Sequence, residues 1–137
     1  MQFESSVEIN ASPEKIFHIY SQVNQWSGWD PDTNFAFLNG DFSANTIIDL
    51  QTQSGARLKI RLLEVIENRS FVTESKLPFC TIRFEHLLQP LQNQTRVTHR
   101  ILFSGILKLF FAFLLGKQMK KSLSQTLLAL KKMENYS

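Results

Sequence analysis

The chain has few of the residues that would cross-link it or divide it into parts. Its 137 residues include one cysteine, five glycines and four prolines. A single cysteine, Cys80, excludes a disulfide bond within the chain and with it the class of disulfide-stapled scaffolds. There is also no repeat, no low-complexity tract and no Pro- or Gly-rich linker, so we expect one domain over residues 1–137.

A long uninterrupted apolar run is also missing. The most apolar passage, LKLFFAFLLG at residues 107–116, can be extended back to Ile101, but Ser104, Gly105 and Lys108 interrupt it. As one straight helix, residues 101–115 would rise only about 22 Å, against a hydrocarbon core of roughly 30 Å. The sequence therefore predicts no transmembrane span. The first ten residues, MQFESSVEIN, lack the basic and apolar regions of a signal peptide, and we expect a cytoplasmic protein.

Strong charge is absent, whereas phenylalanine is abundant. Fifteen basic and twelve acidic side chains give a net charge of only +3, which is no nucleic-acid footprint by itself. Twelve Phe stand against two Tyr and two Trp. Because the Phe side chain makes no hydrogen bond, this composition favours apolar packing or an apolar pocket, and we expect no nucleic-acid partner.

Alternation of apolar and polar residues predicts seven strands. They cover residues 3–10, 34–40, 45–52, 56–64, 70–76, 79–88 and 95–103, and their short separators predict antiparallel pairing. Between the first two strands, Ser12 and Pro13 predict the start of a helix, and residues 23–29 suggest a second short one. The sequence thus predicts an α+β fold that ends in a long helix.

Each strand presents an apolar face that needs a cover. Leu58, Ile60 and Leu62 alternate with Arg57, Lys59 and Arg61, and the other strands alternate similarly. The C-terminal segment is the only long candidate to cover that face, and its Leu residues recur at helical spacing.

Gly116 is unusual in the middle of this predicted helix, because glycine there costs roughly 1 kcal/mol relative to alanine. Together with Ala112 it suggests room between helix and sheet. Close packing against the first helix, or a kink, is the alternative explanation.

Two histidines are predicted to face each other. If residues 90–95 close a hairpin with Leu88 opposite Val97, then His86 falls opposite His99 on the apolar face. The Cβ atoms of directly opposed residues lie roughly 4.5–5.5 Å apart. We expect the two imidazoles either to form the polar end of an apolar pocket or only to bond neighbouring hydroxyl or backbone groups.

No catalytic or metal-binding set is evident. Two histidines are too few for a metal site, and Cys80 lies about 20 Å along the strand from His86, which excludes a Cys–His dyad within this hairpin. Glu64 is the one carboxylate that we consider as an acid or base, because it ends an inward-facing register. We therefore predict no catalytic residue, no metal and no cofactor.

The order of elements and two stretches of sequence suggest a family. With INASPEKIFHIYSQVNQWSGWDPD near the start and HLLQPLQNQTRVTHRILFSGIL near the end, the chain resembles the START-like, or SRPBCC, superfamily, in its polyketide cyclase/dehydrase-related branch. Trp29, Asp30, Pro31 and Gly105 match its motifs. The resemblance implies a helix-grip fold, known from the birch-pollen allergen. In that fold a seven-stranded antiparallel sheet curls around the C-terminal helix and holds a cavity for apolar molecules.

We accordingly expect non-covalent binding or transport of a small hydrophobic ligand, such as a lipid, polyketide, aromatic or quinone-like molecule. The residues expected to line the site are Trp26, Trp29, Phe35, Phe37, Leu58, Ile60, Leu62, Phe84, His86, Leu88, Val97, His99, Ile101, Phe103, Leu109, Ala112, Phe113 and Gly116. The tryptophans with Phe35 and Phe37 would form an aromatic mouth or, alternatively, a satellite core.

Two other functions stay open at this point. One is a polyketide cyclase/dehydratase-like enzyme in which His86, His99 or Glu64 transfers protons. The other is a lipid or quinone chaperone in transient contact with a membrane surface, with Phe110, Phe111 and Phe113 partly exposed and the lysines after Gly116 meeting anionic head groups. The sequence leaves the oligomeric state undetermined.

Overall fold

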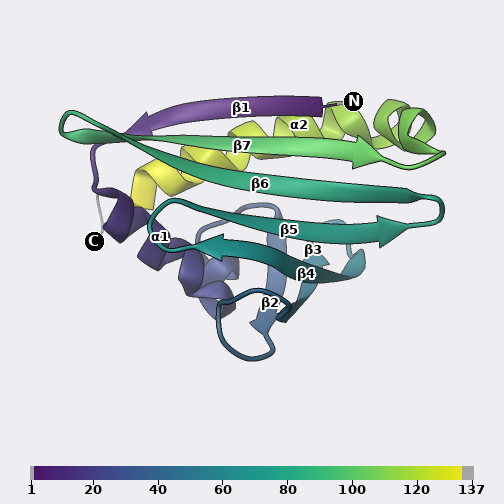
Figure 1. The fold of residues 1–137 in the computed structure, drawn as a ribbon, viewed down its shortest axis with the longest axis horizontal. Helices are drawn as coiled ribbons and strands as arrows, with labels where there is room; N and C mark the ends of the chain where they lie inside the picture. The colour runs from purple at the N-terminus through teal and green to yellow at the C-terminus, as the bar shows by residue number, and fades with distance from the viewer. Residues whose placement is uncertain (1, 134–137) are drawn as a thin grey trace.

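A computed structural model describes residues 2–133, which form one seven-stranded antiparallel sheet, two α-helices and one 3-10 helix (Figure 1). The strands are β1 (Gln2–Ile9), β2 (Thr33–Leu38), β3 (Ile47–Thr52), β4 (Arg57–Ile66), β5 (Ser70–Leu77), β6 (Cys80–Leu91) and β7 (Gln94–Ser104). The helices are α1 (Pro13–Ser21), the 3-10 helix η1 (Val23–Gly28) and α2 (Lys108–Met133). The α+β class, the seven strands and both short helices are as the sequence predicts.

The strand order is β1-β7-β6-β5-β4-β3-β2, so β1 and β2 occupy opposite edges of the sheet. From β2 to β7, each strand pairs with its successor through a short connection, as antiparallel hairpins allow. The segment of α1 and η1 therefore has to carry the chain from one edge to the other, and this crossing brings it beneath the inner face of the sheet.

The local signals at the start of α1 act as expected. The Ser12 hydroxyl accepts a hydrogen bond from the Lys15 amide, and Pro13 fills the first helical position. Near the end of η1, the Trp26 Nε1 donates to the Tyr20 carbonyl oxygen at 2.9 Å. This bond ties the two short helices together and fixes the position of Tyr20.

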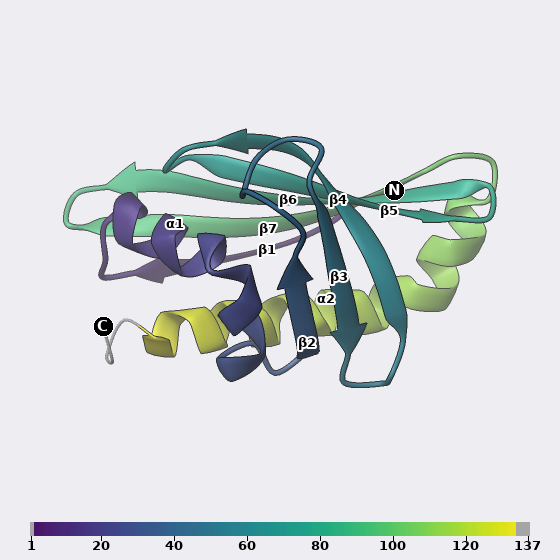
Figure 2. The ribbon, with the colours of Figure 1, turned by 90° about the horizontal axis from the view of Figure 1, so that it is seen from below.

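Helix α2 runs along one side of the inner face. It packs mainly against β1, less against β7 and only slightly against β6. In Figure 2, β2, β3 and β4 cross in front of α2, and the first turns of α2 bend away from the line of the rest of the helix. The inner faces of β3, β4 and β5 are therefore left largely to other side chains.

Gly116 lets α2 approach β1. A Cβ at this position would lie 2.5 Å from Cζ of Phe3 on β1, so the Phe3 ring fills the space that a side chain would need. The glycine therefore serves close packing, but against the first strand rather than against the first helix.

Gly105 fixes the connection between β7 and α2. Its φ of 103° lies in the region that glycine adopts freely, and a Cβ there would lie 2.6 Å from the Phe79 carbonyl oxygen. The Leu107 amide donates to that same oxygen at 3.0 Å. The start of α2 is thus held against the turn between β5 and β6.

Two details of the strands differ from expectation. The β6–β7 hairpin is tighter than residues 90–95 suggest, because the ladder continues to the pair Leu91–Gln94 and Asn93 turns the chain with φ of 62°. In β4, the register shifts between Leu62 and Glu64. This shift leaves Glu64 exposed, paired with Val72 of the outer face, so it does not point inward.

No helix within residues 2–133 combines the length and the apolarity that crossing a membrane would take.

Candidate functional site

The register predicted for the last hairpin is confirmed. Leu88 pairs with Val97 and His86 pairs with His99, and all four face the inner side of the sheet. The two imidazole rings lie edge to face, with centroids 4.7 Å apart. The sheet thus places two polar rings beside each other on an otherwise apolar surface.

Tyr20 of α1 completes this polar cluster. Its hydroxyl is hydrogen-bonded to Nε2 of His99, and its ring contacts both histidine rings, with centroids 5.8 Å from each. Burial, and secondarily the charge of Asp30, raises the pKa of Tyr20 well above its usual value of 10. The phenol therefore keeps its proton and donates a hydrogen bond to Nε2 of His99.

His86 has a different partner. Its Nδ1 lies 3.2 Å from the Phe71 carbonyl oxygen, and its ring stacks on the Phe71 ring with centroids 3.9 Å apart. Because a carbonyl oxygen only accepts, Nδ1 carries the proton and Nε2 is left as a hydrogen-bond acceptor. A bound hydroxyl or amine could donate to that nitrogen.

Both histidines are neutral at physiological pH. Desolvation lowers the pKa of His86 to about 4, an effect that the bond to the Phe71 carbonyl partly offsets. Desolvation also lowers the pKa of His99 well below 6.5, and repulsion from a charged His86 lowers it further. The site is therefore polar but uncharged, which suits a neutral polar group on an apolar molecule.

Four inward-pointing side chains of the sheet keep some exposure to solvent. His86 and Phe84 on β6 are only half-buried although they point inward, and the same holds for Leu50 on β3 and Leu58 on β4. Leu50 and Leu58 lie on strands that α2 barely contacts, whereas Phe84 packs against the cluster under α2.

The rest of the interior is packed in two clusters. One contains Tyr20, Trp26, Phe71, Leu88 and Val97, and the other lies under α2. The second cluster includes Cys80, Ile82, Ile101, Phe103, Ala112 and Leu123. Most of the expected ligand-lining residues are therefore core residues.

Ten of the expected site residues share the inner face of the sheet. They are Leu58, Ile60, Leu62, Phe84, His86, Leu88, Val97, His99, Ile101 and Phe103. Leu62, Val97 and Ile101 among them are completely buried, so only the half-buried members can meet a ligand.

Trp26 of η1 and Trp29, the residue that caps the C-terminal end of η1, both point into the interior. Trp26 is buried and bonded to Tyr20, as a core residue would be. Trp29 packs edge to face on Tyr20 with centroids 6.2 Å apart, and its Nε1 is buried without an acceptor among the described residues. This indole is a candidate donor to a ligand oxygen near the polar cluster.

Phe35 and Phe37 do not join an aromatic mouth with the tryptophans. They pair with Gln51 and Asp49 on the outer face of the sheet and are 52% and 44% exposed. Ala36, which is buried, faces inward in their place. The strand carries apolar side chains on both faces, so alternation alone assigns neither face to the core.

The four expected site residues on α2 separate into two groups. Ala112 and Gly116 are buried, and the Phe3 ring fills the space beside Gly116. Leu109 and Phe113 point away from the sheet, with Phe113 90% exposed. The first turns of α2 therefore contribute no ligand-lining side chain from these two positions.

Sequence reasoning missed Tyr20 and Phe71, the side chains that bond and stack on the histidines. Phe71 follows the same inward alternation as His86, with which it pairs, and could have been found from that register. Tyr20 reaches His99 across 79 residues of sequence, and only the crossing of α1 beneath the sheet brings them together.

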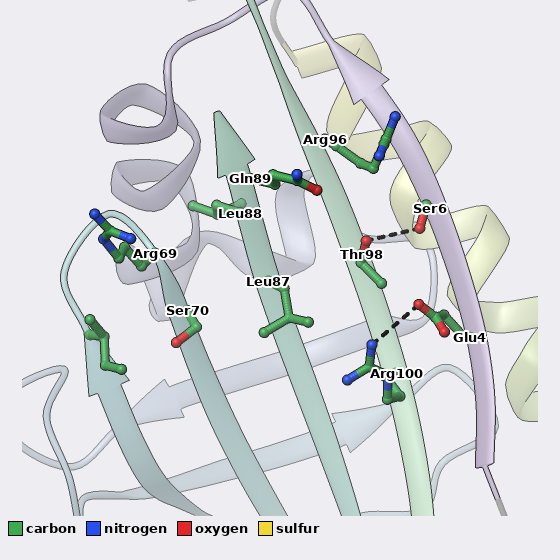
Figure 3. A pocket seen from close by; sticks show the side chains of 11 residues that line it. Glu4, Ser6, Arg69, Ser70, Leu87, Leu88, Gln89, Arg96, Thr98 and Arg100 are labelled. Atoms are coloured by element: carbon green, nitrogen blue, oxygen red, sulfur yellow. Dashed lines mark hydrogen bonds and ion pairs between the residues drawn. The ribbon is translucent and has the colours of Figure 1, made fainter. Parts of the chain in front are cut away.

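Two depressions lie outside this interior. One, of about 550 Å³, lies on the outer face of the sheet, where Arg100 bonds Glu4 at 3.4 Å and Ser6 bonds Thr98 at 2.9 Å (Figure 3). The other, of about 570 Å³, lies between Trp29 and the C-terminal half of α2. Within residues 2–133, no three His, Cys, Asp or Glu side chains gather in a group able to hold a metal ion.

Solved structures with this fold come from varied organisms and processes. Norcoclaurine synthase from Thalictrum flavum aligns with a TM-score of 0.78 at 13% identity, covering 100% of this chain and 87% of that one. A START superfamily protein from Mycobacterium smegmatis gives 0.73 at 17% identity, with 99% of each chain covered. The protein Ara h 8.0201 gives 0.80 at 10% identity, covering 100% and 99%. At these identities the likeness shows the helix-grip fold alone.

Family membership is stronger evidence than any single structure. No curated protein matches the chain. A family model described as polyketide cyclase / dehydrase and lipid transport matches residues 1–133, almost the whole sequence. The chain therefore belongs to the polyketide cyclase, dehydrase and lipid transport family.

Proposed function

We propose that this protein binds a small, largely apolar molecule non-covalently on the inner face of its sheet, with the molecule's polar group at His86. The observation that carries the proposal is the half-buried pair His86 and Phe84, which join an acceptor nitrogen to an accessible apolar surface. Pockets for small molecules are mostly apolar with a few convergent polar groups, and this region has that character.

The polar cluster supports a ligand with a neutral head group. The Nε2 atom of His86 accepts, so a ligand hydroxyl can donate to it, whereas a ligand carbonyl can only accept from the unpaired Nε1 of Trp29. His99 is already bonded to Tyr20, so we assign it a positioning role rather than a ligand contact. Lipids, polyketides, quinones and aromatic alcohols all combine such a group with an apolar body.

The first test is native mass spectrometry of gently purified protein, which detects a copurified molecule by its mass. We expect an adduct of a few hundred daltons that organic solvent removes. Binding of a long-chain alcohol should then weaken in His86→Phe, while binding of a pure hydrocarbon probe should not. If the variant binds both probes as the wild type does, the head group does not lie at His86.

A second candidate function is proton-transfer catalysis on a polyketide- or aromatic-like substrate. The observation that favours it is the hydrogen-bonded pair of Tyr20 and His99 beside His86, which can pass a proton between groups in a low-dielectric site. Glu64 is excluded from this role because it faces outward. Turnover of an aromatic polyketide that His86→Phe abolishes, with folding intact, would favour the enzyme over the carrier.

A further inference from the structure

Six large apolar side chains are exposed together at one end of the molecule. They belong to the β5–β6 turn, the β7–α2 connection and the first two turns of α2, and we call them the apolar end: Phe79, Ile106, Leu109, Phe110, Phe113 and Leu114. Phe113 is 90% exposed and Ile106 is 88% exposed. The hydrogen bond from the Leu107 amide to the Phe79 carbonyl holds the turn and the helix start side by side.

Such a cluster of exposed apolar side chains indicates a surface that binds a partner. Single exposed hydrophobic residues are ordinary, but a contiguous apolar patch marks a protein or membrane interaction site. The side chains of the apolar end come from three segments and do not belong to the ligand region, which lies on the inner face beside α1. Their exposure is therefore unrelated to binding at His86.

The backbone at Phe79 gives independent evidence. Its φ is 57°, in the left-handed region where a bulky residue is an outlier. The other residues except glycine that adopt positive φ among residues 2–133 are all asparagines, namely Asn45, Asn68 and Asn93. An aromatic ring at this turn is disfavoured by both the backbone and the solvent, so neither turn formation nor core packing explains it.

Basic side chains follow the apolar end along the helix. Helix α2 carries six lysines and no acidic residue over Lys108–Met133. Residues four apart share a helix face, so Leu109, Phe113 and Lys117 form one exposed row, with Lys120 and Lys121 close to it. These three lysines lie about 6–12 Å along the axis beyond Phe113, at 1.5 Å per residue.

We propose that the apolar end docks on a bilayer that contains anionic lipids. The phenylalanines and leucines enter the boundary between head groups and acyl chains, while Lys117, Lys120 and Lys121 meet the negative head groups. A second copy of the chain fits this surface less well, because an isologous contact between two such ends would bring lysines of like charge together. The proposal goes beyond ligand binding and does not depend on it.

The experiment is co-sedimentation with vesicles of phosphatidylcholine, either alone or mixed with phosphatidylserine. We expect binding to the mixed vesicles and much weaker binding to phosphatidylcholine alone, with added salt releasing the protein. Phe113→Ser should lower the partition coefficient about tenfold, since a large exposed ring is lost from the apolar contact. Lys120→Gln and Lys121→Gln should each lower it about fivefold.

Matched controls separate docking from general changes at the surface. Phe37→Ser removes an exposed ring from the outer face of β2, and Lys131→Gln removes a lysine from the far end of α2, so both should bind vesicles as the wild type does. Phe79→Asn should weaken vesicle binding while leaving the midpoint of thermal unfolding equal or higher, because asparagine suits the turn.

Three results would overturn the proposal. One is equal partitioning of the wild type, Phe113→Ser and Lys120→Gln into mixed vesicles. Another is wild type that stays in the supernatant at low salt. The third is a concentration-dependent dimer that Phe113→Ser dissociates, with no vesicle binding, which would assign the surface to a second copy. Binding of a fluorescent fatty alcohol without vesicles reports on His86 separately, and Phe113→Ser should leave it unchanged.

Discussion

At the scale of single residues, the two histidines show how far the sequence reaches. Their pairing was predictable from the alternation of residues and the position of one hairpin. Side chains alternate between the two faces of a strand, so one known pair fixes all the others along the hairpin. The bond of His99 to Tyr20 depends instead on tertiary packing, which no local pattern encodes. The pairing of the two histidines was therefore predictable, whereas the hydrogen bonds that decide which ring nitrogens carry a proton were not.

The neutral histidines predict a loss of stability in acid. The pKa of His86 is about 4 when folded and 6.5 when free, so between these values the unfolded chain binds a proton that the folded chain does not. This contribution to the unfolding free energy is complete above about pH 6.5 and is lost as the pH falls towards 4. The difference for His86 alone amounts to roughly 3 kcal/mol.

Urea unfolding across this pH range measures the effect. The unfolding free energy should fall from pH 7 to pH 4.5 in the wild type and fall less steeply in His86→Phe. The raised pKa of Asp32, caused by desolvation and by Asp30, acts in the opposite direction and favours the folded state at the acid end. Equal slopes for the two proteins would show that His86 is solvated in the folded state.

Gly116 supplies a second prediction at this scale. In Gly116→Ala the new Cβ would meet the Phe3 ring, which itself packs on Phe103. Overpacking of about 1–3 kcal/mol should exceed the gain of roughly 1 kcal/mol in helix propensity, so the variant should be less stable than the wild type.

The background Phe3→Leu provides the control, because it gives the new methyl group room. There, Gly116→Ala should stabilise the protein by up to about 1 kcal/mol, as measured by urea unfolding. A destabilising effect of equal size in both backgrounds would mean that the helix, rather than Phe3, disfavours the methyl group.

At the scale of elements, the hydrogen bonds of Asp30 join three parts of the chain. Its Oδ1 accepts from Thr126 on α2 at 2.8 Å and from the Asp32 amide at 3.1 Å, and its Oδ2 accepts from Thr33 at the start of β2 at 2.8 Å. This carboxylate therefore holds the C-terminal half of α2 to the loop that follows η1.

Thr126→Val should remove this tie with little change in shape. We expect the unfolding free energy to drop by about 1–2 kcal/mol, the usual value of a partly buried hydrogen bond to a charged group. Gln125→Ala, at the neighbouring exposed position of α2, is the control and should change stability by less than about 0.5 kcal/mol. A drop of the same size in the control would indicate a general loss of helix stability instead.

The elements also show which parts of the fold sequence patterns can and cannot give. Strand and helix boundaries were accessible because alternation and capping are local. The inner face of β2 was not, since Phe35 and Phe37 on one side and Ala36 and Leu38 on the other are all apolar. The position of α2 over β1 was also hidden, because it depends on Gly116 meeting a ring more than a hundred residues away.

At the scale of the whole molecule, the sheet, α1 and α2 form two packed interior clusters, and His86 stays partly exposed on the inner face. The large cavity under α2 that the family resemblance implies is replaced there by side chains such as Phe3 and Phe103. The two proposals use apolar surface in two separate places, the inner face near His86 and the apolar end. These places carry the two proposals separately.

The most direct test of ligand binding on the inner face is isothermal titration calorimetry with a series of straight-chain primary alcohols. Each CH₂ group that becomes buried contributes about 0.8 kcal/mol, so the Kd should fall about fourfold per carbon until the accessible region is full. His86→Phe should raise the Kd by the same factor at each chain length, because only the contact with the hydroxyl is lost. A Kd that stays constant across the series would contradict the account, since apolar burial on the inner face would then not drive binding.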